Sequence, residues 1–175
     1  MKKIILTYGL IAGAIVTAFM AYGVYAFNKN PDFEGGMVLG YTGMLVAFSF
    51  VFIGVKKYRD GQNDGFITFG KAFKIGALIS LIASTVYVGV WLLEYYCLYP
   101  DFMDKYAAGM LKKMDTATMT AAEIKAKTDE IAMYKEAYKS PIMVILWTYL
   151  EILPLGLIVT LISSLILKKR QPATA

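Results

Sequence analysis

Residues 141–170 have the sequence PIMVILWTYLEILPLGLIVTLISSLILKKR. About 27 nearly unbroken apolar residues are followed by three cations, and a helix rising ~1.5 Å per residue over that length crosses a hydrocarbon core of ~30 Å with some tilt. The run carries one carboxylate, Glu151, three residues before Pro154. This stretch predicts a transmembrane helix with an acid near its middle.

Three further apolar runs precede this one in the 175-residue chain. With 58% hydrophobic residues, 18% charged residues and a mean hydropathy of +0.54, the chain is too apolar for a soluble fold of its size. We therefore expect an all-α membrane protein, a single integral-membrane domain over 1–175 with four transmembrane helices. The expected spans are residues 4–27, 37–55, 75–99 and 141–167.

The first apolar run has a second interpretation. Val24-Tyr25-Ala26 resembles a signal-peptide cleavage site, which would leave three spans after cleavage. The run is well beyond a typical h-region of ~7–15 residues, so we favour an uncleaved helix.

Residues 100–140 form the one sizeable polar segment, between the third and fourth spans. Phe102, Tyr106 and Met110 recur at four, which predicts an amphipathic helix, and Thr120 to Glu123 form a capping-box pattern that opens a second helix. We expect a short two-helix extracytoplasmic excursion.

Small residues recur along each expected span. Gly9 and Gly13 are four apart, and Gly36, Gly40 and Gly43 form a similar face. Such spacing lets helices approach closely, and we expect packing within the bundle rather than self-association. Comparable series in the later spans are Gly76, Ser80 and Ala83, and Gly156, Thr160 and Ser164.

The cations predict the orientation of the spans. The net charge of +5 does not indicate nucleic-acid binding, because the cations lie at the ends of apolar runs. One set of ends carries Lys2, Lys3, Lys56, Lys57, Arg59, Lys71, Lys74, Lys168, Lys169 and Arg170 against only Asp60 and Asp64. By the positive-inside rule, both ends of the chain face the cytoplasm.

Two carboxylates, Glu94 and Glu151, lie within apolar runs and form the candidate intramembrane polar site, with Tyr87, Thr148 and Pro154. An ionised carboxylate in lipid costs several kcal/mol, so each acid must be paired, hydrated or protonated. No Lys or Arg lies in the core of any expected span to pair with Glu151, so we expect it to be protonated and hydrogen-bonded to Tyr or Thr.

Each acid has two interpretations. Glu151 is either a neutral acid that joins helices, which we rank first, or a proton or cation site. Glu94 shares a helix face with Ser80 and Tyr87, which would direct it into the bundle, whereas a position at headgroup level is slightly favoured.

The sequence argues against most enzymatic chemistry. It has no histidine, one cysteine, Cys97, and neither a phosphate loop nor a dinucleotide fingerprint nor a nucleophile elbow. Methionines such as Met103 and Met110 could bind Cu(I), but Met is the usual filler of small packing surfaces, so we expect no metal and no cofactor.

Three motifs resemble a known family: the run Phe69 to Gly76 that opens a span, the stretch Tyr99 to Phe102, and Glu151 to Gly156 followed by Lys168-Lys169-Arg170. Together they resemble the uncharacterised bacterial membrane family DUF4199, over nearly the whole chain. The resemblance implies a four-span architecture and the inner membrane of the cell, but no reaction.

These observations lead to two hypotheses of function. The first is a non-enzymatic accessory or scaffold subunit, in contact with the lipid bilayer and with other membrane proteins or a second copy of itself. The alternative is a small transporter or an ion- or proton-responsive protein that uses Glu151 and Glu94.

Overall fold

The computed structural model describes residues 1–30, 33, 36–114 and 118–169. The described chain is helical, with one isolated antiparallel bridge between Ile67 and Lys169. The helices are α1 (Lys2–Lys29), α2 (Gly36–Gln62), α3 (Phe69–Leu93), the π-helix η1 (Glu94–Leu98), α4 (Phe102–Lys112), α5 (Ala121–Ala137) and α6 (Pro141–Leu167). Four helices, with α3 and η1 as one, are long and apolar enough to cross a membrane, as predicted.

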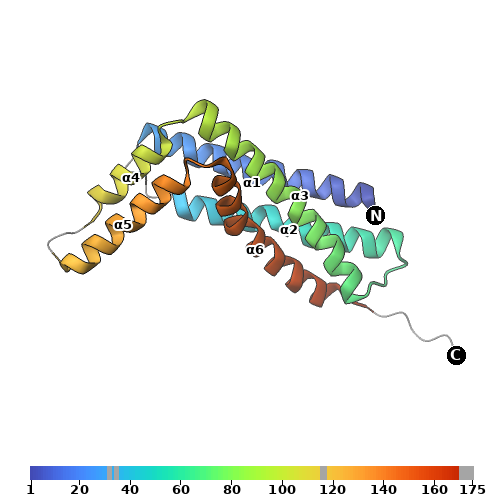
Figure 1. The fold of residues 1–175 in the computed structure, drawn as a ribbon. Coiled ribbons are helices and arrows are strands. Elements are labelled where there is room, and N and C mark those ends of the chain that lie inside the picture. The colour runs from blue at the N-terminus through green and yellow to red at the C-terminus, as the bar shows by residue number, and fades with distance from the viewer. Residues whose placement is uncertain (31–32, 34–35, 115–117, 170–175) are drawn as a thin grey trace.

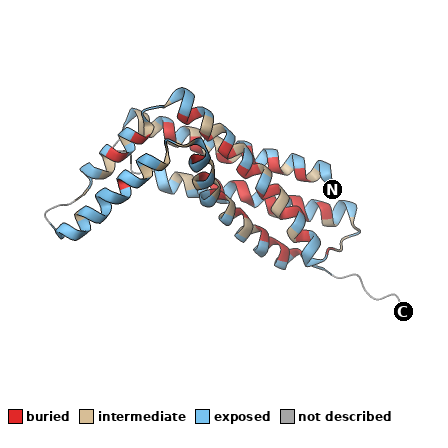
Figure 2. Ribbon diagram, viewed as in Figure 1, coloured by how far each residue is buried: buried red, intermediate tan, exposed pale blue. Residues whose placement is uncertain are grey.

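The four long helices form one bundle (Figure 1). The start of α1, the α2–α3 connection and the end of α6 lie at one end, which we call the basic end after its lysines. At the other end, the hairpin end, α4 and α5 lie side by side and point away from the bundle axis. Buried residues gather on the long helices, whereas α4 and α5 are mostly exposed (Figure 2).

Glycines hold the long helices close together. A Cβ atom added at Gly9 would lie 2.8 Å from Ile82, and one added at Gly13 would lie 2.9 Å from Val86, so α1 packs tightly on α3. A Cβ at Gly76 would lie 2.7 Å from Thr160, which brings α3 against α6. These contacts confirm the expected packing at Gly9, Gly13 and Gly76, whereas a Cβ at Gly40 would meet no atom within 4 Å.

The α3–α6 contact also contains buried hydrogen bonds. The Ser80 hydroxyl donates to the Gly156 carbonyl over 3.1 Å and lies 3.1 Å from the Thr160 hydroxyl. All three residues are buried. In the hydrocarbon region such bonds have few alternative partners, so they fix the register of α3 on α6.

The connection at the basic end is shorter than the sequence predicted. The expected loop over residues 56–65 is helical as far as Gln62, so α2 extends about two turns beyond the predicted span. The Thr68 side chain caps α3 by accepting a hydrogen bond from the Lys71 backbone N–H. The Ile67–Lys169 bridge then ties the α2–α3 connection to the end of α6.

At the hairpin end, ion pairs and hydrogen bonds hold the two short helices in place. Lys135 of α5 pairs with Asp104 of α4 over 2.6 Å, and the Lys105 ammonium donates to the Asn28 side chain of α1 over 2.6 Å. The predicted capping box is present, since Thr120 and Glu123 bond each other's backbone N–H groups. The structure thus confirms two helices between the third and fourth long helices.

Candidate functional site

A cavity of about 760 Å³ lies at the hairpin end, and we call it the hairpin-end cavity. Its wall comes from α1, α2, α3 and α6 of the bundle and from α4 and α5 above them. Most lining side chains are aromatic rings or methionines, and among the described lining residues Glu151 is the only acid and Lys113 the only base. Both tryptophans of the chain, Trp91 and Trp147, lie in this wall.

The cavity is closed towards the basic end. Phe48, Val51 and Ile79 are 0% exposed and fill the bundle beyond it. The cavity is therefore confined to the hairpin end of the bundle.

Glu151 is exposed and lines the cavity. Among the described residues, its carboxylate has no hydrogen-bond partner. The Thr148 hydroxyl, an expected partner, donates instead to the Val144 carbonyl of its own helix over 2.7 Å. The carboxylate is thus available to a molecule in the cavity.

The pKa values of two tyrosines in the cavity wall are raised, in part by the negative charge of Glu151. Burial raises the pKa of Tyr138 to about 12, and the Glu151 carboxylate is the next largest cause. Burial also raises the pKa of Tyr106, with smaller contributions from Tyr134, Glu130 and Glu151. Both phenols are therefore protonated at neutral pH and offer hydroxyl groups near the acid.

The remaining residues of the predicted site separate into two groups. Tyr87 of α3 and Thr148 of α6 line the cavity with Glu151, so the structure brings these three together. Pro154 lies outside the cavity lining, on an exposed position of α6. It cannot donate to the Leu150 carbonyl, and α6 changes direction along its length (Figure 1).

Glu94 is buried at 7% exposure and does not line the cavity with Glu151, so the cavity holds only one of the two candidate acids. The depth of Glu94 in the membrane, and with it the slightly favoured headgroup-level position, stays a prediction. Its Oε2 atom has no hydrogen-bond partner in the part of the chain that the structure describes. Glu94 begins the π-helix, in which the Tyr99 backbone N–H bonds the Glu94 carbonyl over 2.8 Å.

Cysteine and carboxylate side chains do not converge on a metal site in the described chain. It contains no group of three or more Cys, Asp or Glu side chains that could hold an ion. The methionines also divide, because Met103 and Met110 line the cavity whereas Met133 is exposed.

The family model described as protein of unknown function (DUF4199) matches residues 7–169. The chain belongs to the DUF4199 family. Among curated proteins and solved structures there is no match. The family match runs from the first turns of α1 to Lys169, so the hairpin and Glu151 both lie within the matched region.

Sequence reasoning missed most aromatic residues of the DUF4199 cavity. Tyr134 and Trp147 pack ring against ring with centroids 5.6 Å apart, and the Trp147 indole N–H has no partner among the described residues. Tyr134 lies on α5, and no periodicity within α5 could show that this helix faces α6.

Proposed function

We propose that this DUF4199 protein is a multi-pass protein of the bacterial inner membrane that binds a small cationic amphiphile in the hairpin-end cavity. The observation that carries the proposal is the lone Glu151 carboxylate in an aromatic cavity of about 760 Å³. Ligand sites in proteins measure ~300–1,000 Å³ and combine apolar walls with a few polar groups. The function is one of binding, without a chemical step.

The proposed orientation places the cavity at the outer face of the membrane. In the described chain, the basic end carries Lys2, Lys3, Lys56, Lys57, Arg59, Lys71, Lys74, Lys168 and Lys169. Arg170, which belongs to the same set of cations, lies outside the described residues. Short basic segments stay in the cytoplasm, so the basic end is cytoplasmic and the α4–α5 hairpin is extracytoplasmic.

The side chains that line the hairpin-end cavity indicate which kind of ligand it would bind. A carboxylate without a partner attracts a cation, and the faces of Tyr and Trp rings attract an ammonium group that has lost part of its water. Methionine side chains adapt to varied apolar shapes. An organic ammonium with a compact apolar body would interact favourably with the carboxylate, with the aromatic rings and with the methionine side chains.

The two tryptophans allow a direct test, because both line the cavity. The purified protein in nanodiscs is titrated with phenyltrimethylammonium and with its neutral isostere, tert-butylbenzene, while Trp fluorescence is recorded. The cation should bind more tightly. Glu151→Gln should weaken cation binding by at least roughly 10-fold and leave the isostere unaffected.

A second variant fills the cavity without changing charge. A Cβ at Gly40, which lines the cavity, meets no atom within 4 Å, and the same holds for Gly89, which lines no cavity. Gly40→Leu should therefore weaken binding of both probes, whereas Gly89→Leu should not. Equal affinity of the cation and the isostere, or binding unchanged in both Glu151→Gln and Gly40→Leu, would refute the proposal.

The accessory-subunit hypothesis stays a prediction that copurification from native membranes would test. No feature of the described chain favours it over ligand binding, because apolar exposed faces are expected wherever helices meet lipid. Channel-like transport is disfavoured by the closed half of the bundle, where Phe48, Val51 and Ile79 are fully buried.

A further inference from the structure

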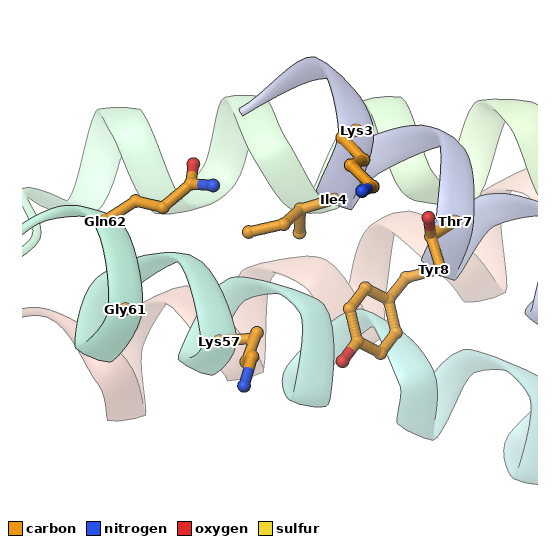
Figure 3. Close-up of a pocket in the computed structure, with 7 residues that line it drawn as sticks. All are labelled: Lys3, Ile4, Thr7, Tyr8, Lys57, Gly61 and Gln62. Atoms are coloured by element: carbon orange, nitrogen blue, oxygen red, sulfur yellow. The ribbon is translucent and has the colours of Figure 1, made fainter.

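A second hollow lies at the basic end, between the first turns of α1 and the last turns of α2. We call it the basic-end cleft. It has a volume of about 230 Å³ and is lined by Lys3, Ile4, Thr7 and Tyr8 of α1 and by Lys57, Gly61 and Gln62 of α2. Figure 3 shows Lys3 on α1 and Lys57 on α2, with the Lys57 side chain directed away from Lys3, and the Ile4 side chain extending from α1 towards the end of α2.

The cleft is positively charged. None of its lining residues is acidic, and in the described chain neither Lys3 nor Lys57 forms an ion pair. The acid nearest to Lys57 in the sequence, Asp60, is bound by Arg59 over 2.6 Å. The two lysine charges are therefore not neutralised from within the protein.

The position and shape of the cleft indicate what it can hold. Lys3 lies in the first turn of its helix and Lys57 near the end of its own, at the level where lipid phosphates meet a membrane-spanning bundle. The Thr7 hydroxyl adds a hydrogen-bond donor, and Ile4 and Tyr8 supply an apolar wall. A Cβ at Gly61, which lines the cleft, would meet no atom within 4 Å, so a larger side chain fits at this position.

We propose that the basic-end cleft binds a phosphate group, that of an anionic phospholipid, with Lys3 and Lys57 on the phosphate. Ile4 and Tyr8 contact the glycerol and the first acyl carbons. The site is independent of the hairpin-end cavity, since the two hollows share no lining residue and lie at opposite ends of the bundle. The apolar wall is the reason to name a lipid, because a free phosphate ion gains nothing from Ile4.

The test measures lipid retention by native mass spectrometry of the full-length protein. The protein is titrated with phosphatidylglycerol, with zwitterionic phosphatidylcholine of the same chain length, and with inorganic phosphate as a competitor. The double variant Lys3→Gln/Lys57→Gln removes both lining charges and should weaken phosphatidylglycerol binding by roughly 30-fold. Its matched control is Lys2→Gln/Lys56→Gln, which removes two charges from the adjacent positions and should have a much smaller effect.

A third variant separates the cleft from general surface charge. Gly61→Leu fills the opening while keeping every lysine, and Leu is a better helix former than Gly, so the fold is not endangered. It should weaken lipid binding, whereas Gly70→Leu, at another open position of the same end, should not.

The outcomes are distinct. Equal losses in the two double-lysine variants would show unspecific attraction and overturn the proposal, as would unchanged binding in Gly61→Leu. Displacement of the lipid by millimolar inorganic phosphate, with no preference for phosphatidylglycerol, would overturn the lipid assignment and leave a free-phosphate site. None of these results depends on whether the hairpin-end cavity binds a cation.

Discussion

Gly156→Ala tests the contact on which the bundle depends. Gly156 of α6 faces α2 and α3, and an added Cβ would lie 2.8 Å from two ring carbons of Phe48 and 3.0 Å from the Ser80 Cβ. Phe48 and Ser80 are both 0% exposed, so neither side chain has free space to move into. The methyl group can be accommodated only if α6 moves away from its neighbours.

Two opposing effects determine how much Gly156→Ala changes the free energy of unfolding. Inserting a methyl group into a filled core costs ~1–3 kcal/mol, whereas Ala in place of Gly stabilises a helix by up to ~1 kcal/mol. Moving α6 would also stretch the hydrogen bond from Ser80 to the Gly156 carbonyl, and such bonds contribute ~0.6 kcal/mol in membrane proteins. We expect a net loss of about 1–2 kcal/mol in the free energy of unfolding.

The control is Gly89→Ala, at a helical position of α3 where a Cβ meets no atom within 4 Å. Since both variants share the gain in helix propensity, the difference between them isolates the steric cost, expected at ~1–3 kcal/mol. Unfolding by SDS in mixed micelles, followed by circular dichroism, measures both free energies. If Gly156→Ala proves as stable as Gly89→Ala, α6 does not approach α2 and α3 as closely as described.

Three further predictions concern single interactions. Ser80→Ala should lower the free energy of unfolding by ~0.6–1.7 kcal/mol in the same SDS assay, because it removes the hydroxyl that bonds the Gly156 carbonyl and Thr160. Thr120→Ala should destabilise α5 by ~1 kcal/mol through loss of the capping box, seen as faster hydrogen exchange confined to the first turn of α5. Burial raises the pKa of Tyr138 from 10.0 to about 12, so its contribution to stability is complete below pH 10 and is lost as the pH rises towards 12. Tyr138→Phe should therefore reduce the fall in stability over that pH interval, and an unchanged fall would contradict the assigned pKa.

The long helices could be predicted because the signal is local. A run such as residues 141–167 is apolar along its whole length, and every turn adds to the same conclusion. The predicted ends of these helices were less accurate. Residues 56–62 carry four charges and a glycine, and only the contacts of Arg59 and the packing of Tyr58 show why the helix continues through them.

The acids were harder to place because their surroundings depend on tertiary contacts. Helical spacing put Glu94 on the buried face with Ser80 and Tyr87, which is where the structure has it. It could not show that the π-helix begins at Glu94, nor that the cavity ends before reaching it. For Glu151, the sequence predicted a position near the middle of its span. The cavity beside Glu151 is formed by helices that are far apart in the chain, so the sequence could not predict it.

The glycines of α2 explain how that space arises. Gly43 packs against Phe19 of α1 so closely that a Cβ would lie 2.5 Å away, whereas Gly40, one turn nearer the hairpin end, faces open space. On α1, a Cβ at Gly23 would be in ordinary contact with Leu39 of α2, at 3.6 Å. The approach of the two helices is thus closest at Gly43 and less close towards the hairpin end.

The cavity therefore comes from the paths of the backbones and not from small side chains alone. Had it been only a lack of side-chain volume, neighbouring residues could relax into it at little cost. A gap between diverging helices persists unless something occupies it, and here α4 and α5 cover it with aromatic side chains while leaving Glu151 accessible. A hollow maintained in this way, with one acid and closed towards the basic end, fits a binding site better than it fits a packing defect.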